Sequence, residues 1–265
     1  MRLKGRVALV AGATRNIGKA IALTYAREGA DLVLVGRKSA DELAQVAADC
    51  ATLGAKTLTT IADIGDPAQV DATVAKGLDR FGRIDVHVSV AALRPHKPFW
   101  EISNAEWQEV HAVNLFSTFY FAKALAPAMM KQKSGSIIAL GGLASLTGQP
   151  LRAHVIASKT GLFGLIKALA LELGPYGVRA NLIAVGHIDT ERRNPEWYPE
   201  GGGVPFMGEK GAGSDGSTLG RAEGGTPLGR LGTPDEVAKV ALFLASDESS
   251  YVTGDRIICA GGRYM

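Results

Sequence analysis

Short apolar runs alternate with longer amphipathic segments along almost the whole chain. The runs are brief and rich in β-branched residues, as strands buried on both faces are, and lie at 7–11, 31–35, 57–61, 84–90, 136–140, 178–184 and 256–260. Between them, apolar residues recur at helical spacing near 17–28, 41–53, 67 onward, 104–131, 153–173 and 234–246. This alternation predicts an α/β fold, a doubly wound parallel sheet in a single domain over residues 1–265.

The first run leads into a glycine-containing loop, Gly12-Ala13-Thr14-Arg15-Asn16-Ile17-Gly18, which opens a helix. Such a loop lets the backbone approach a pyrophosphate at the helix N-terminus, where free N–H groups and the helix dipole favour anions. Asn16 stands where a middle glycine is typical, and asparagine is the residue that best replaces glycine at left-handed backbone angles. The loop predicts a dinucleotide site, with an unliganded βα turn as the alternative.

Composition adds mainly exclusions. The chain has 265 residues, 46% of them hydrophobic, and a formal charge of +3, which is too small to argue for a nucleic-acid partner. Cys50 and Cys259 are isolated and the five histidines lack metal-ligand spacing, so we expect no disulfide framework and no metal. No apolar segment approaches membrane-spanning length, and the apolar start is interpreted as a strand. We therefore expect a cytoplasmic protein with no membrane partner.

Further motifs resemble the short-chain dehydrogenase/reductase family nearly end to end. They are the loop just described, Ala62-Asp63-Ile64, Ser89-Val90-Ala91-Ala92, Asn114 in Val-Asn-Leu, Ser158-Lys159, the stretch from Arg179-Ala180-Asn181 to Thr190, Pro227-Leu228-Gly229-Arg230 and Gly261-Gly262. The resemblance implies a Rossmann-type sheet of about seven parallel strands. It also implies a substrate lid at about 191–226, a small-molecule substrate and a homotetramer, or a hetero-oligomer with an active homologue.

The resemblance also implies which residues hold a nicotinamide cofactor. Asp63 matches the residue that touches adenine, and Lys159 matches the one that holds the nicotinamide ribose. The cofactor-binding residues expected on this basis are Gly12, Thr14, Arg15, Asn16, Ile17, Gly18, Arg37, Lys38, Asp63, Ile64, Ala91, Lys159, Ile188 and Thr190.

The end of the second strand favours NADP over NAD. A carboxylate there would accept from the ribose 2′-OH, whereas cations suit a 2′-phosphate. Arg37 and Lys38 follow the strand directly, the nearest acid along the chain is Asp41, and Arg15 is expected to approach the same corner. Ordinary solvated surface cations are the alternative interpretation.

Two expected catalytic groups are missing. In the resembling family a tyrosine protonates the carbonyl oxygen, a serine fixes that oxygen, and a lysine and an asparagine support the tyrosine. Lys159 and Asn114 occupy their positions, but Val155 stands where the tyrosine should be and Gly142 where the serine should be. Valine has no titratable proton and glycine has no hydroxyl. The cofactor-holding half of the site is present, and the proton-donating half is gone.

Other residues could replace the missing acid. His187 lies in the turn that faces the nicotinamide in the resembling family, and is assigned as a catalytic candidate with Asn114 and Lys159. His154 adjoins the valine but should point about 100° away from it along the helix. Tyr198, in the expected lid, could supply a hydroxyl. The hydroxyls of Ser145 and Thr147 are expected to serve turns.

A basic loop follows the fourth strand at the edge where open α/β sheets bind ligands. Arg94, His96 and Lys97 could bind an anionic substrate there or could simply be solvated, while the lid aromatics would suit an apolar one. His87 alternates with valines in a strand and is expected in the core, and His111 is expected to be structural.

Three functions stay open at this point. The first is an NADP-dependent oxidoreductase with an unorthodox proton donor. The second is non-redox chemistry (hydrolysis, dehydration or isomerisation) in a pocket reshaped by Gly142 and Val155. The third is a catalytically silent nucleotide-binding subunit. All three stay open because function is argued from the site and not from the fold.

Overall fold

The computed structural model describes residues 1–191 and 226–264. Its sheet has seven parallel strands in the order β3-β2-β1-β4-β5-β6-β7. The strands are β1 (Val7–Ala11), β2 (Asp31–Gly36), β3 (Thr57–Ile61), β4 (Val86–Ser89), β5 (Gly135–Gly142), β6 (Val178–Val185) and β7 (Arg256–Cys259). The order reverses between β1 and β4, so the loops after these two strands open a crevice at one edge, where such sheets bind ligands.

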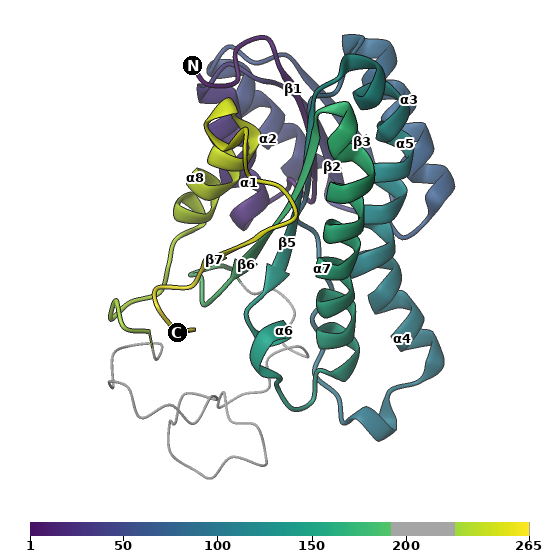
Figure 1. The fold of residues 1–265 in the computed structure, drawn as a ribbon, viewed down its shortest axis with the longest axis vertical. Coiled ribbons are helices and arrows are strands. Elements are labelled where there is room, and N and C mark those ends of the chain that lie inside the picture. The colour runs from purple at the N-terminus through teal and green to yellow at the C-terminus, as the bar shows by residue number, and fades with distance from the viewer. Residues whose placement is uncertain (192–225, 265) are drawn as a thin grey trace.

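Helices cover both faces of the sheet (Figure 1). One face carries α1 (Asn16–Arg27), α2 (Ala40–Thr52) and α8 (Pro234–Ala245), and the other α3 (Pro67–Phe81), α5 (Ser117–Gln132) and α7 (Ala153–Leu173). The short helices α4 (Asn104–His111) and α6 (Ala144–Thr147) lie at the end of the molecule to which β5 points (Figure 1). The α/β class, the parallel sheet and the single domain predicted from the sequence are confirmed.

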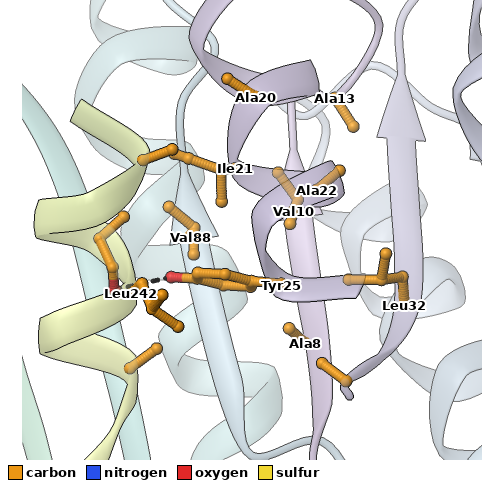
Figure 2. Packing of buried hydrophobic residues seen from close by; sticks show 14 of the residues in the cluster. Ala8, Val10, Ala13, Ala20, Ile21, Ala22, Tyr25, Leu32, Val88 and Leu242 are labelled. Atoms are coloured by element: carbon orange, nitrogen blue, oxygen red, sulfur yellow. Dashed lines mark hydrogen bonds between the residues drawn. The ribbon is translucent and has the colours of Figure 1, made fainter. Parts of the chain in front are cut away.

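The core is divided by the sheet into two apolar layers. In the layer beneath α1, the Tyr25 ring is fully buried and its hydroxyl donates to the carbonyl oxygen of Ala241 in α8 at 2.9 Å (Figure 2). A buried tyrosine hydroxyl needs such a partner. This bond ties the first helix of the domain to its last.

The prediction of one long helix over 104–131 was wrong in one respect. Regular α-helix stops at His111, a π-helical turn covers Ala112–Phe116, and α5 begins at Ser117. A π-turn inserts one residue without a glycine or proline to announce it, and such turns are frequent at functional sites. Asn114 lies within it.

Helix α7 also corrects the expectation about membrane-spanning length. With the turn that follows it, it runs over Ala153–Tyr176 and is long and apolar enough to cross a membrane by length and composition. Its inner face packs on β5 and β6, and the buried positions recur at helical spacing: His154, Val155, Ser158, Lys159, Leu162, Ile166, Ala170 and Leu173. This packing is that of a core helix in an α/β domain.

Candidate functional site

The loop after β1 is shaped by its glycines. Gly12 has φ +97°, and a Cβ there would lie 2.7 Å from the backbone nitrogen of Ala91 in the loop after β4. A Cβ on Gly18 would collide with the Gly12 backbone, so neither position accepts a side chain without movement. Asn16 has φ +50°, which confirms that the loop keeps a left-handed residue here. The predicted Gly-rich turn is therefore formed.

The Asn16 side chain has a second role that the sequence did not reveal. Its amide donates to the Glu191 carbonyl at 3.0 Å and accepts from the Glu191 N–H at 3.1 Å. The loop after β1 is thus joined to the segment after β6. Nothing in either stretch alone signals this contact, because the two residues lie 175 positions apart.

The N-terminus of α1 fits a phosphate group. No acidic residue occupies its first turn, and no side chain caps it. The Nη1 atom of Arg15, the residue just before the helix, is buried and has no hydrogen-bond partner among the described residues. Unmet N–H groups and an unpartnered guanidinium nitrogen are what the pyrophosphate of a dinucleotide would satisfy.

At the end of β2 the structure corrects the count of nearby acids. Arg37 pairs with Asp63 at 3.0 Å and lies 3.7 Å from a Glu109 carboxylate oxygen. These residues line a cavity of about 200 Å³, with Gly65, Asp66, Ala112 and Val113. Asp41 was the nearest acid along the chain, but folding brings two others to Arg37. A 2′-phosphate would have to compete with these carboxylates for the guanidinium.

Other predicted cofactor residues lie at the same edge of the sheet. Thr14 packs against the end of β2, since a Cβ on Gly36 would lie 2.9 Å from its methyl group. Lys38 is exposed and Ile64 is buried. Ile188 is buried and pairs with Gly232, and the Thr190 hydroxyl reaches the Ile188 carbonyl at 3.5 Å.

Lys159 is buried on α7, with 8% of its surface exposed. Its ammonium donates to the Leu140 carbonyl at 2.7 Å, near the end of β5. Burial lowers the pKa of Lys159 to about 7, and the positive charge of Arg94 acts in the same direction. The amine can therefore hold or release a proton near neutral pH.

Asn114 links the loop after β4 to α7. Its amide accepts from the Leu93 N–H at 2.8 Å and donates to the Leu93 carbonyl at 2.9 Å. The same NH₂ group donates to the Ser158 hydroxyl at 3.2 Å, next to Lys159. The structure therefore brings the two predicted residues of the cofactor-holding half together through Ser158.

The positions of the missing groups also lie at this site. Val155 is buried on α7 one helical turn before Lys159. Gly142 ends β5, and a Cβ there would meet no atom within 4 Å. The Ser145 hydroxyl donates a hydrogen bond to the Gly142 carbonyl at 2.7 Å, and the Thr147 hydroxyl donates one to the Gly148 carbonyl. These two hydroxyls serve turns, as expected.

The histidines take different positions. His154 is buried, and the charges that act on it come from Glu106, His111 and Lys97; burial lowers its pKa. His187 is exposed, and its Nδ1 lies 2.6 Å from an Arg263 guanidinium nitrogen. His154 thus faces α4 and its loop, whereas His187 stays at the end of β6 as a candidate. Tyr198 and the expected lid from 192 to 225 lie outside the described residues.

Two further histidines, His87 and His111, are structural, as expected. His87 is fully buried against the Phe121 ring, and burial lowers its pKa to about 3, which keeps it neutral. His111 bonds the Trp107 carbonyl at 2.8 Å and stacks on that indole. Within residues 1–191 and 226–264, no cluster of three or more His, Cys, Asp or Glu side chains could hold a metal ion.

The comparisons with known proteins agree with this geometry. A family model described as short chain dehydrogenase matches residues 6–200, and one described as enoyl-(acyl carrier protein) reductase matches residues 202–263. The chain belongs to the short-chain dehydrogenase family. Its membership confirms the resemblance seen in the sequence, and it places the chain among oxidoreductases that bind nicotinamide cofactors.

Named relatives span the chain almost completely. The short-chain dehydrogenase described here is 34% identical to the 3-oxoacyl-[acyl-carrier-protein] reductase of Escherichia coli (strain K12), over 100% of both chains. It is 31% identical to the L-rhamnose 1-dehydrogenase (NAD(P)(+)) of Sphingomonas sp. (strain SKA58), over 99% of this chain and 98% of the relative. The crystal structure of levodione reductase matches with a TM-score of 0.86 and 31% identity, over 99% and 98% of the two chains.

Proposed function

We propose that this short-chain dehydrogenase is an NADP(H)-dependent oxidoreductase of a carbonyl or alcohol substrate, with a proton donor other than tyrosine. One observation carries the proposal. The buried amine of Lys159 and the amide of Asn114 are assembled at the ligand-binding edge, although Val155 replaces the tyrosine. A pocket that bound nothing would gain stability from an apolar residue in place of a buried cation.

The cofactor residues that we propose are those predicted from the sequence. A bound nicotinamide dinucleotide would supply or accept the hydride. Gly12 and Gly18 let the backbone approach its pyrophosphate, and Arg15 offers the unpartnered nitrogen to a phosphate. Arg37 and Lys38 would bind the 2′-phosphate of NADP. The name of the E. coli relative, a 3-oxoacyl-[acyl-carrier-protein] reductase, supports only the carbonyl class of substrate.

The proton is proposed to come from Lys159. Reduction of a carbonyl adds a hydride to carbon and a proton to oxygen. Lys159 Nζ carries a proton below its pKa of about 7 and can pass it to that oxygen, which leaves a neutral amine beside the Leu140 carbonyl. His187 is the second candidate, and its exposed position near Arg263 makes it the weaker one.

Restoring the missing groups tests the site. Gly142→Ser adds a side chain into open space, and Val155→Tyr places a phenol one turn before Lys159. If the pocket is otherwise competent, the double variant should reduce simple ketones faster than the unmodified protein, by about a hundredfold for a placed general acid. Gly142→Ala with Val155→Phe is the matched control. An equal rate in both double variants would contradict the proposal.

The replaced tyrosine also keeps a second function open, a catalytically silent nucleotide-binding subunit. Titration with NADPH, followed by its fluorescence, supports either function if binding is saturable. Nicotinamide oxidation during a carbonyl screen then favours the enzyme. Absence of binding by both NADPH and NADH would end both proposals and leave non-redox chemistry.

We propose a cytoplasmic homotetramer, with assembly beside an active homologue as the alternative. Large apolar side chains are exposed on three helices: Trp107 on α4, Phe119 on α5 and Leu171 on α7, the last 80% exposed. Light scattering after size exclusion tests the assembly, and a monomeric mass would overturn it.

A further inference from the structure

The basic loop after β4 has three cationic or ionisable residues, and the structure separates them. Lys97 is held by Glu106 at 2.8 Å, and this contact, together with hydrogen bonds from Ser103, lowers the pKa of Glu106 to about 2. His96 Nε2 accepts from the Arg152 guanidinium at 2.7 Å. Arg94 is exposed and has no hydrogen-bond or ion-pair partner among the described residues. One of the three is therefore available to a ligand.

The position of Arg94 is fixed by its neighbours. The preceding residue, Leu93, is held by Asn114 through both its N–H and its carbonyl group. Asn114 also bonds Ser158, the residue before Lys159. This chain of bonds keeps the backbone at Arg94 against the part of α7 that carries the buried amine.

The charges at this point are unbalanced. Arg94 is the charged group whose field acts on Lys159, and no carboxylate among the described residues opposes it there. Two like charges beside each other in a partly desolvated site repel, and an anion between them would remove the repulsion. The site also has room, because Gly142 faces open space.

We propose that Arg94 binds the carboxylate of an anionic carbonyl substrate, an oxo acid, whose carbonyl group lies toward Lys159 and Gly142. The assignment of the carbonyl group to Lys159 and Gly142 rests on the proposed function, whereas the assignment of the carboxylate to Arg94 does not. A guanidinium matches a carboxylate with two parallel N–H···O bonds, which an ester cannot accept with the same strength. The anion also favours the protonated form of Lys159, so binding should take up a proton near neutral pH.

Calorimetric titration tests this inference without any turnover. The probes are acetoacetate and pyruvate, each compared with its own methyl ester, added to the protein alone and to the protein saturated with NADP⁺. We expect at least one acid to bind in the millimolar range or tighter, and its ester more weakly. Arg94→Gln should weaken binding of that acid about tenfold or more, and Arg94→Lys should restore part of it.

Lys56→Gln is the matched control, since it removes an exposed cation just before β3, away from the site. It should leave acid binding unchanged. Equal binding of acid and ester, no saturable binding of either acid, or an Arg94→Gln variant that binds as tightly would overturn the inference. NADPH affinity, measured separately on the unmodified protein, keeps the two proposals apart: NADPH binding without acid selectivity defeats only the carboxylate site, and acid binding without NADPH binding defeats only the oxidoreductase.

Discussion

Replacing Lys159 by methionine should stabilise the folded protein at acidic and neutral pH. Burial, with a smaller effect of Arg94, lowers the pKa of this lysine from 10.5 to about 7. At about 1.4 kcal/mol for each pH unit, keeping the charged amine inside the fold costs about 5 kcal/mol below pH 7. Methionine removes this cost but leaves the Leu140 carbonyl without its donor, which costs about 1–3 kcal/mol. The net gain in the free energy of unfolding is about 2–4 kcal/mol near pH 6.

The sign of this effect should reverse with pH. Between about pH 7 and 10.5 the unfolded chain binds more protons at Lys159 than the folded chain does, so stability of the unmodified protein rises across this window. The methionine variant lacks that rise. Above the window, the neutral amine still donates to Leu140, and the variant should be the less stable protein by about 1–3 kcal/mol.

Urea unfolding followed by circular dichroism at about pH 6, 8 and 10 measures the difference at each pH. Comparing the two proteins at the same pH cancels the other titrating groups. Lys167→Met, which removes an exposed ammonium from the same helix, controls for the loss of one lysine. A difference that stays constant from pH 6 to 10 would refute the argument, because it would mean that the Lys159 amine is not desolvated in the fold.

Two further predictions concern the nucleotide corner and the core. Arg37→Ala should weaken NADPH binding about tenfold or more while NADH binding changes little, and it should change stability by less than about 1 kcal/mol because its pair with Asp63 is exposed; parallel titrations decide it, and equal losses for both nucleotides would count against the NADP assignment. Tyr25→Phe should lower the free energy of unfolding by about 1 kcal/mol, since one buried hydrogen bond to Ala241 is lost, and an unchanged urea midpoint would contradict this.

Local sequence was sufficient for most of the fold. The α7 helix begins and ends where periodicity placed it, at Ala153 and Leu173, and Asp66 caps α3 by accepting from the Ala68 N–H at 2.9 Å. Both depend on residues within a turn or two of each other. The short helix α6 was missed, because its few residues read as a Gly/Ser loop.

The candidate site depended more on contacts between distant segments. The two carboxylates at Arg37 come from the loop after β3 and from α4, so an inspection of the chain near Arg37 could not find them. Likewise, the hydrogen-bond partner of His96 is Arg152, which lies 56 residues away along the chain. Residue types predicted which positions could bind charge, but the fold decides which of those charges already have partners.

That distinction bears on whether the site turns over a substrate. A silent nucleotide-binding subunit would need the cations proposed to face phosphates and the lysine proposed to hold a ribose. It would have no use for the unpartnered guanidinium of Arg94, whose charge acts on that lysine and which no described carboxylate offsets there. The cost of keeping two cations close together is recovered only when an anion binds between them. The charge arrangement therefore favours a site that receives a second ligand beside the nucleotide, and this supports the oxidoreductase over the silent subunit.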